Sequence, residues 1–370
     1  MSVERELLVS SVMLAGLVVS ASLVPLARWL ARRLGVMDAP GERKVHETPM
    51  PRLGGVAVFV SFTALVALGY SLIPTLADST WLRSQIPGSL RMLREAYRVE
   101  GKLTAMLIGA AVAFGVGVLD DVLGRRFPVW LKLAGQVAAA LILIAGGVRV
   151  SFLPFDWMNF AVTLLWIVGI TNAFNLLDNM DGLSTGVAFV ASLVFLINAW
   201  ALGEFFISLL LAAFMGALLG FLFFNFHPAS VFLGDCGSLF IGFVMASLTL
   251  LERYVSHASS SLFPILMPVV VLAVPLLDTA TVIVIRVRER RPIYVGDKRH
   301  LSHRLVALGF STRAAVLFIY LATFTLGLGA VSLADATLQQ SLLLSLQSVC
   351  FVVLLLVLLF HDRLGGREPV

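Results

Sequence analysis

The sequence predicts an all-α protein that crosses a membrane about eleven times. Hydrophobic residues make up 59% of the 370 residues and only 13% are charged, whereas about a quarter of an average soluble domain is charged. The mean hydropathy is +0.96. The apolar residues also gather in runs of roughly 20, the length that a helix needs to cross the bilayer core.

Each apolar run sets one expected span. Several runs contain Gly or Pro, which membrane helices tolerate when their neighbours satisfy the backbone. The first run follows Glu4 and Glu6 rather than a basic segment, so it is expected to be retained. Cys236 and Cys350 lie far apart in or beside apolar sequence and are expected to be free thiols. The expected spans are residues 7–28, 53–75, 103–119, 130–149, 157–173, 184–202, 205–224, 236–252, 262–285, 314–334 and 341–360.

The expected topology puts the N-terminus outside and the C-terminus in the cytoplasm. An odd number of spans separates the two ends, and this orientation leaves most of the 27 Lys and Arg residues on the cytoplasmic side. We expect one transmembrane domain over residues 1–370, with its active site on cytoplasmic loops. Those loops are residues 29–52, 120–129, 172–183, 225–237 and 286–313.

Acidic residues and amides form three clusters in these loops. Asp120 and Asp121 end the third span, and adjacent helical residues point about 100° apart, so one could hold a metal while the other faces a substrate. The alternative is a helix end with solvated acids. Asn175, Asp178 and Asp181 are three apart and would share a helical face. A capped loop is the alternative for them.

The third cluster runs from Asn225 to Asp235. Asp235 lies between Gly234 and the next helix, where small neighbours would let a phosphate or a metal approach. Phe232 could stack on a nucleobase or simply pack, and His227 before Pro228 is expected to be structural.

A basic cluster runs from Asp297 to Arg304. His300 and His303 would point the same way on a helix, but two His are a weak zinc signal without a third ligand. With Arg299 and Arg304 nearby, phosphate binding is the better interpretation. The alternative is a loop that anchors the protein at lipid head groups. Lys44 belongs to a smaller basic set, for which substrate contact and a topogenic role are open alternatives.

Acids, bases and imidazoles at one membrane face suit phosphoryl transfer. Ionisable groups at a membrane boundary mark function, and Mg²⁺ prefers carboxylate oxygens and bridges phosphates. No P-loop or kinase motif is present in the sequence. An ion-coupled transporter is a hypothesis of another class, but it would place its acids near mid-span. A non-catalytic lipid-binding protein would not need paired acids opposite paired His.

Together, the clusters from Lys44 to His303 resemble the polyprenyl-phosphate N-acetylhexosamine-1-phosphate transferases, the WecA/TagO and MraY group. The resemblance implies transfer of N-acetylglucosamine-1-phosphate from UDP-GlcNAc to undecaprenyl phosphate, with UMP released. It also implies Mg²⁺, with Mn²⁺ as a substitute, and a multi-pass protein of the bacterial inner membrane. The expected partners are the UDP-amino sugar, undecaprenyl phosphate, the lipid bilayer and a second copy of the chain, and nucleic acid is not expected to bind. An MraY-like phospho-N-acetylmuramoyl-pentapeptide transferase is the alternative.

The resemblance also assigns roles to residues. Asp120 and Asp121 match the aspartate pair, and Asp120 would orient or deprotonate the lipid phosphate. Asp235 matches the metal ligand, shared with Asp120. Gly124 and Ser302 depart from the MraY pattern and favour the WecA/TagO branch, as does the eleventh span. The remaining matches are Asn175, Asp178 and Asp181 beside the nucleotide, Asn225 and Phe232 at the nucleoside, and His300 and His303 at the diphosphate. Lys44, Arg299 and Arg304 are expected as further substrate contacts because they are basic, not because of the resemblance.

Overall fold

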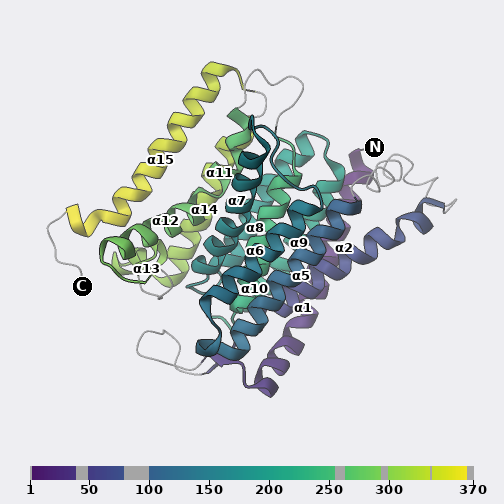
Figure 1. The fold of residues 1–370 in the computed structure, drawn as a ribbon, viewed down its shortest axis with the longest axis horizontal. Helices are drawn as coiled ribbons and strands as arrows, with labels where there is room; N and C mark the ends of the chain where they lie inside the picture. The colour runs from purple at the N-terminus through teal and green to yellow at the C-terminus, as the bar shows by residue number, and fades with distance from the viewer. Residues whose placement is uncertain are drawn as a thin grey trace. The chain divides into compact units, whose positions relative to one another are not determined.

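The computed structural model describes residues 2–38, 49–78, 100–254, 263–292, 299–333 and 336–364. Its contacts divide the chain into two compact units, Met1–Glu252 and Arg253–Val370 (Figure 1). Each unit is described by itself below. The single transmembrane domain over residues 1–370 stays a prediction.

The described residues of unit 1 form eight long helices and one short hairpin. The two short strands pair antiparallel, with Met37 opposite Pro51. The elements are α1 Ser2–Leu34, β1 Met37–Asp38, β2 Met50–Pro51, α2 Gly55–Asp78, α5 Glu100–Leu123, the 3-10 turn η2 Gly124–Arg126, α6 Val129–Ala145, α7 Asp156–Leu177, α8 Leu183–Ala201, α9 Phe205–Asn225 and α10 Gly234–Leu251.

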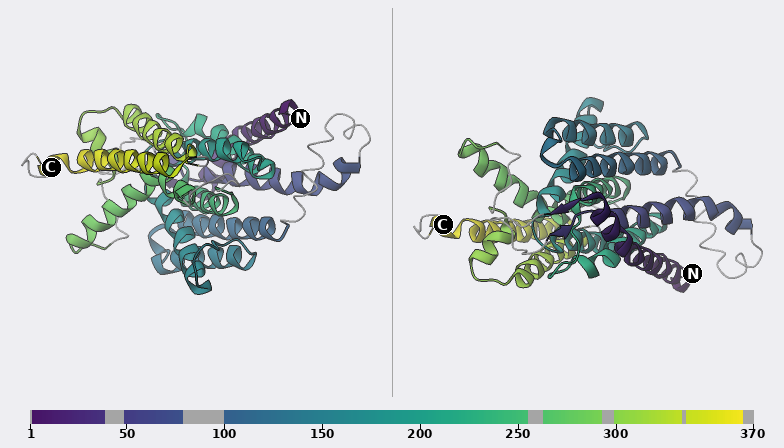
Figure 2. Two further views of the ribbon diagram at one scale, coloured as in Figure 1. Left: turned by 90° about the horizontal axis from the view of Figure 1, so that it is seen from above. Right: turned by 90° about the horizontal axis from the view of Figure 1, so that it is seen from below.

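Helix α10 is the centre of unit 1. It contacts α2, α5, α7, α8 and α9, and 83% of the residues in its apolar stretch are buried. A helix enclosed on all sides must be apolar all round, as this one is beyond its first turn. A Cβ on Gly117 of α5 would overlap the backbone of Asp235 and Cys236, so a glycine lets α5 pack directly on the start of α10. Helices α5 and α6 run side by side along one margin of the unit (Figure 2).

Unit 2 is organised around α14. This helix contacts α11, α12, α13 and α15. The chain bends by 66° between α11 and α12, because Pro275 has no N–H to donate to the preceding turn. The elements are η3 Phe263–Leu266, α11 Met267–Val271, α12 Ala273–Arg288, α13 Leu301–Ala307, α14 Thr312–Val331 and α15 Leu338–Leu364.

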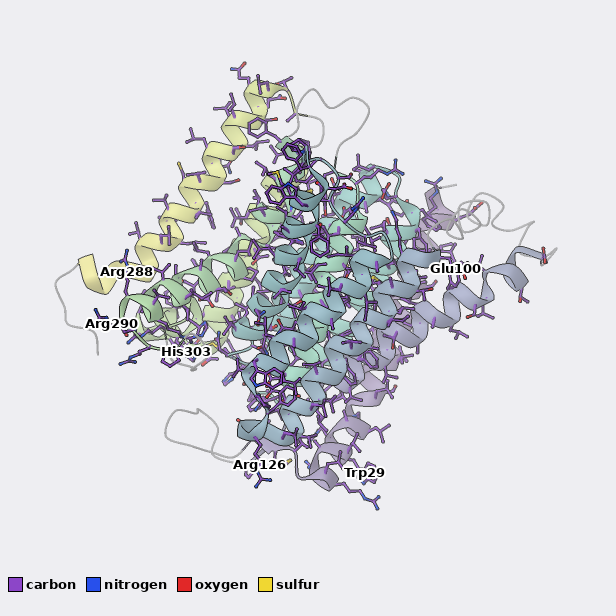
Figure 3. All side chains as sticks on the ribbon, in the orientation of Figure 1. Trp29, Glu100, Arg126, Arg288, Arg290 and His303 are labelled. Carbon is purple, nitrogen blue, oxygen red and sulfur yellow. The ribbon has the colours of Figure 1, made fainter. Side chains whose placement is uncertain are left out.

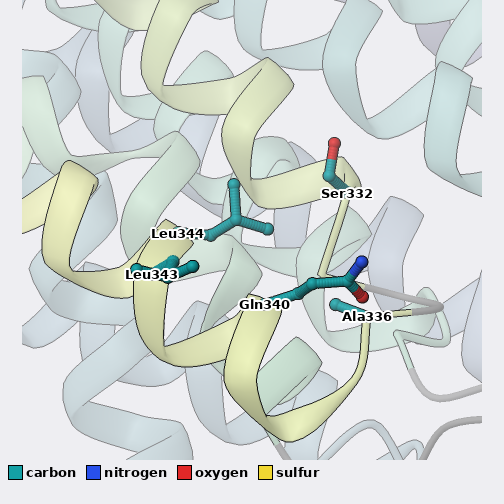
Figure 4. Close-up of a pocket in the computed structure, with 5 residues that line it drawn as sticks. All are labelled: Ser332, Ala336, Gln340, Leu343 and Leu344. Carbon is teal, nitrogen blue, oxygen red and sulfur yellow. The ribbon is translucent and has the colours of Figure 1, made fainter.

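A small groove lies between the end of α14 and the start of α15 (Figure 4). Its lining is Ser332, Ala336, Gln340, Leu343 and Leu344. Because none of these side chains is ionisable, the groove offers no acid or base for chemistry.

The all-α membrane fold is confirmed. Among the described residues, nine helices are long and apolar enough to cross a membrane, and the bent pair α11–α12 counts as a tenth span. The predicted eleventh span corresponds to α6, which is apolar but shorter than the other spans, so the number eleven stays a prediction. The span ends lie within about four residues of those expected, except that α1 runs six residues further, to Leu34. The orientation of the two termini stays a prediction. Cys236 and Cys350 are free, as expected.

Candidate functional site

Three of the four predicted clusters come together at one end of unit 1. Helices α5, α7 and α9 end there, and α2, α6, α8 and α10 begin there, because hydrogen bonds and ion pairs join these termini. Figure 3 places Arg126, just beyond α5, and Trp29 of α1 at this end, with Glu100 at the far end of α5. The site is therefore built from helix termini rather than from mid-span residues.

Asp121 fixes the start of α10. Its Oδ1 accepts the backbone N–H of Asp235 at 2.9 Å, and its Oδ2 accepts that of Cys236 at 2.8 Å. The Nε atom of Arg52 lies 3.2 Å from the same Oδ1. Asp121 is 8% exposed, so this carboxylate caps α10 from another helix and satisfies N–H groups that have no partner within α10.

Gly234 permits this arrangement. Its φ is +77°, and a Cβ there would overlap the carbonyl oxygen of Arg52 and press on the Asp121 carboxylate. Only glycine adopts this left-handed conformation without strain while the backbone comes so close. The Gly that precedes Asp235 in the sequence is thus explained by the turn into α10.

Asp120 points away from its neighbour and meets Lys132 of α6. The Nζ atom of Lys132 lies 2.7 Å from Asp120 Oδ2 and 2.8 Å from Asp235 Oδ1. The Asp120 side chain is 18% exposed, whereas that of Asp121 is 0% exposed. The two adjacent aspartates therefore face different partners, and Asp120 is the one that solvent reaches.

Asp235 is the point on which the cluster converges. Its Oδ2 receives Arg52 Nη2 at 2.6 Å, and its Oδ1 receives Asn175 Nδ2 at 2.6 Å as well as Lys132. Asn175 also donates to Ser238 Oγ at 2.8 Å. Burial by itself would lower the pKa of Arg52, but the charges of Asp235 and Asp121 outweigh it and raise that pKa above its ordinary value.

Asp178 and Asp181 lie in the loop between α7 and α8. Burial, and then the charge of Asp235, raise the pKa of Asp178 to about 8, against the opposing effect of Arg52. At neutral pH this carboxyl group is therefore mostly protonated. Asp181 Oδ2 lies 2.8 Å from His227 Nδ1 and accepts the N–H of Ala229 at 3.1 Å, which ties this loop to the one after α9.

Asn225 and Phe232 also lie at this end of unit 1. Asn225 is 3% exposed. Its Oδ1 accepts the N–H of Gly182 at 3.2 Å and the hydroxyl of Thr185 at 3.3 Å, while its Nδ2 donates to the Val231 carbonyl at 3.0 Å. In this arrangement Asn225 braces the start of α8, and its nucleoside contact stays a prediction. The Phe232 side chain is partly exposed, so stacking on a base stays a prediction for it too.

The two histidines belong to unit 2, at the start of α13. His300 Nδ1 lies 2.7 Å from Asp278 Oδ2, and the rings of His300 and His303 lie 6.4 Å apart at 62°. Arg299 pairs with Glu289. Arg304 Nε donates to the Arg299 carbonyl at 3.1 Å. The contact of this group with the acids of unit 1 stays a prediction. Lys44, Asp297 and Lys298 lie outside the described residues.

Lys132, Arg52 and Asp278 were not among the expected site residues. Lys132 lies inside an apolar helix and Asp278 inside the apolar run of α12. An ionisable residue within a membrane segment is itself a signal of function. Arg52 belongs to the basic set of Lys44, for which substrate contact and a topogenic role were both left open. Nothing local in the sequence connects it with Asp235, which lies 183 positions away.

The donor chemistry of the cluster fits a divalent cation such as Mg²⁺. Among the described residues, no three His, Cys, Asp or Glu side chains are arranged to hold a metal. Two carboxylates, Asp120 and Asp235, do reach a common point, which Lys132 Nζ occupies. Mg²⁺ is usually bound by one or two carboxylates, with water and substrate phosphates completing its shell. The residues therefore fit Mg²⁺ once Lys132 turns toward another anion.

The charges of the cluster agree with this. Among the described residues, Asp120, Asp121 and Asp235 pair with Arg52 and Lys132, and Asp178 is mostly protonated at neutral pH, so one negative charge is in excess in the cluster. The Asp235 charge contributes to the raised pKa of Asp178, which shows the same excess. A divalent cation would neutralise it.

Comparison with known proteins finds relatives over nearly the whole chain. Residues 103–252, from α5 to just beyond α10, match the model of glycosyl transferase family 4. The chain is 34% identical over 358 residues to a probable undecaprenyl-phosphate N-acetylglucosaminyl 1-phosphate transferase of Bacillus subtilis, covering 94% of this chain and 91% of the relative.

Two further relatives are named for different substrates. A decaprenyl-phosphate N-acetylglucosaminephosphotransferase of Mycobacterium tuberculosis (strain H37Rv) is 35% identical over 335 residues, covering 82% of this chain and 77% of the relative. A phospho-N-acetylmuramoyl-pentapeptide-transferase of Shouchella clausii is 29% identical over 261 residues, covering 65% and 72%. The matched family region holds Asp120, Asp121, Lys132, Asn175 and Asp235.

Proposed function

We propose, since the chain belongs to glycosyl transferase family 4, that it transfers N-acetylglucosamine-1-phosphate from UDP-GlcNAc to undecaprenyl phosphate. The products are undecaprenyl-diphospho-N-acetylglucosamine and UMP. One observation carries the proposal: four carboxyl groups and two cationic groups meet at one end of unit 1. Phosphoryl transfer is mostly positioning and charge neutralisation, which such a cluster supplies.

The reaction exchanges one phosphorus–oxygen bond for another. An oxygen of the lipid phosphate bonds to the β-phosphorus of the donor, and the bond from that phosphorus to the bridging oxygen breaks, so that UMP leaves with the electron pair. Asp120 is the exposed acid of its pair and orients the lipid phosphate. A phosphate monoester is already largely ionised at neutral pH, so little proton removal is needed. Mg²⁺, or Mn²⁺ in its place, would be held by Asp235 and Asp120 and would neutralise the donor diphosphate.

The protein's own groups divide the remaining tasks. Asp121 holds the start of α10, and with it Asp235, in place. Arg52 and Lys132 are the cations within reach of the donor phosphates, because both already contact Asp235. Asp178 is mostly protonated at neutral pH and can therefore donate a hydrogen bond to the nucleotide. Phe232 stacks on the uracil, and His300 and His303 contact the diphosphate.

The substrates suggest where the protein lies. UDP-sugars are soluble cytoplasmic molecules, so the proposal places the acidic end of unit 1 at the cytoplasmic face of the inner membrane. Arg28, Arg32 and Arg33 support this orientation, because they lie in the last two turns of α1, whose end shares this face with the cluster.

A homodimer is also proposed, through α15. Gln347 is exposed about midway along its apolar span Leu338–Val357. A carboxamide in hydrocarbon is better satisfied by another amide across a helix interface. Because the same group donates and accepts, two copies related by a two-fold axis can pair through it.

The test uses the full chain in nanodiscs with undecaprenyl phosphate, Mg²⁺ and radiolabelled UDP-GlcNAc. The expected result is release of UMP with transfer of label to the lipid. Asp235→Asn should abolish both, while Asp156→Asn, which changes an exposed acid far from the cluster, should leave them unchanged. UMP release that persists in Asp235→Asn would refute the mechanism. Transfer only from UDP-N-acetylmuramoyl-pentapeptide would favour the MraY-like alternative.

A further inference from the structure

Two amide side chains join α6 to α7 behind the acidic cluster of unit 1. Asn172 Nδ2 of α7 donates to Gln136 Oε1 of α6 at 2.5 Å, and Gln136 Nε2 donates back to Asn172 Oδ1 at 3.3 Å. Asn172 Nδ2 also donates to the Val168 carbonyl at 2.8 Å. Gln136 is 2% exposed. Because a buried amide costs free energy unless it is hydrogen-bonded, the pair is a directional link between two apolar helices.

The pair lies about one helical turn from two residues of the cluster. Lys132 precedes Gln136 by four positions on α6, and Asn175 follows Asn172 by three on α7. Residues at these spacings share a helix face. Because α6 begins and α7 ends at the cluster, both steps lead toward it. Lys132 Nζ and Asn175 Nδ2 meet there on one atom, Asp235 Oδ1, at 2.8 Å and 2.6 Å.

The pair also fixes how α6 packs on its neighbours. Helix α6 contacts α5 and α7, and Lys132 reaches from it to Asp235 of α10. On the α5 side the packing is close, because a Cβ on Gly135 would overlap the side chain of Val116. On the α7 side the hydrogen bonds are directional and weaken steeply as distances and angles change. The amide pair therefore fixes which residue of α6 lies beside which residue of α7.

We propose that Gln136 and Asn172 are positioning residues. Their pair sets the register of α6 against α7 and thereby places Lys132 beside Asp235. This inference rests on the proposed function, in which Lys132 is a cation within reach of the donor phosphates. A pair that only holds two helices together would explain a loss of stability when it is removed, but it would not explain an effect that depends on Lys132.

Two variants separate these roles. Gln136→Met removes the pair and keeps a side chain of similar length. Trp166→Phe is the matched control, because Trp166 Nε1 of α7 donates to Thr249 Oγ1 at 2.9 Å, near the end of α10 that is far from the cluster. Each variant removes a link between α7 and a neighbouring helix, so both should inactivate at a lower temperature than the wild type. A rescue variant exchanges the two amides, Gln136→Asn with Asn172→Gln, and keeps their combined length.

Steady-state kinetics are measured for the full chain in nanodiscs. A misplacement of about 1 Å can cost roughly 100-fold in rate, so Gln136→Met should lower kcat by at least roughly tenfold. The exchanged pair should recover most of this loss, and Trp166→Phe should retain kcat. Because Gln136 acts through Lys132, adding Gln136→Met to Lys132→Met should cost little more than Lys132→Met alone, whereas independent effects would multiply.

Binding of Mn²⁺ in the absence of donor gives a readout that does not need turnover. A displaced Lys132 competes less for the carboxylates of Asp120 and Asp235, so Gln136→Met should bind Mn²⁺ several-fold more tightly than the wild type, and Trp166→Phe should not. Equal Mn²⁺ affinity in Gln136→Met and the wild type, or a kinetic loss that multiplies with that of Lys132→Met, would overturn the inference. A wild type that releases no UMP from any UDP-sugar would instead overturn the proposed function, and the Mn²⁺ affinities would still test the positioning.

Discussion

The adjacent acids Asp120 and Asp121 should respond in opposite ways to the same substitution. Asp121→Asn should mainly destabilise the protein, because this carboxylate caps α10 and contacts Arg52 while being buried. Asp120→Asn should mainly abolish activity, because this side chain is partly exposed and pairs with Lys132, which keeps Asp235 as a partner.

The structure sets the expected magnitudes. An Asn at position 121 can still accept one of the two backbone N–H groups, but its NH₂ group faces the other. A hydrogen bond to a charged group contributes about 1.5–3 kcal/mol, and breaking a buried ion pair costs about 3–5 kcal/mol. Because Arg52 keeps Asp235, we expect a total loss of about 3–5 kcal/mol. For a unit of this size, that corresponds to a fall of roughly 10 °C in the unfolding temperature. Asp120→Asn should cost about 1 kcal/mol or less.

The assay is thermal inactivation of the purified variants in one detergent, followed by fluorescence-detected size exclusion, with UMP release measured at a temperature where both are folded. Asp120→Asn should have wild-type stability and no turnover. Equal inactivation temperatures for Asp121→Asn and the wild type would contradict the capping role. Loss of stability in Asp120→Asn instead would show that the two side chains are assigned the wrong way round.

Three further predictions follow from the charges and from α15. Lys132→Met should raise the affinity for Mn²⁺ at least tenfold in the absence of donor, because the ammonium group no longer competes for the carboxylates of Asp120 and Asp235. Electron paramagnetic resonance measures this affinity, and Lys102→Met, at an exposed position in α5, is the control. An unchanged Mn²⁺ affinity in Lys132→Met would refute the shared site. The pKa of Asp178 is raised from 3.8 to about 8, so between these pH values the folded protein binds more protons than the unfolded one, and its stability falls as the pH rises through this window. Asp178→Asn should therefore gain thermostability relative to the wild type from pH 5 to pH 9. Curves of unfolding temperature against pH that run parallel for the two proteins would count against this. Mild oxidation in membranes should crosslink two copies through the exposed Cys350, and Gln347→Leu should lower the yield of crosslinked dimer. A protein that remains monomeric at every oxidant concentration would exclude the α15 interface.

The spans could be predicted from the sequence because hydrophobicity is a local property. A window of about 20 residues contains all the information needed to recognise a membrane helix, and α8 and α9 were accordingly placed to within one residue at each end. The bend between α11 and α12 was not predicted, although Pro275 could have indicated it. A proline in a membrane segment predicts a break only when its neighbours leave room for one.

The acids of the site were recognisable because they are polar residues at the ends of apolar runs. Their partners were not, because pairing depends on contacts between distant segments. Lys132 meets Asp235 across 103 positions. No local pattern could show that Asp121 uses both of its oxygens on the backbone of α10 while Asp120 uses one on a lysine. The sequence alone therefore found the aspartate pair and left the division of roles open.

That division follows from the hydrogen-bond capacity of each carboxylate. An ionised carboxylate that accepts bonds from fixed backbone groups cannot turn to a substrate without leaving those groups unpaired, which costs free energy at every turnover. A carboxylate held only by a lysine side chain can exchange that partner for a metal or a phosphate-bound cation, because the lysine can move to another anion. By this criterion Asp121 is fixed and Asp120 is exchangeable through Lys132, while Asp235 can exchange Lys132 but keeps Arg52 and Asn175 as partners.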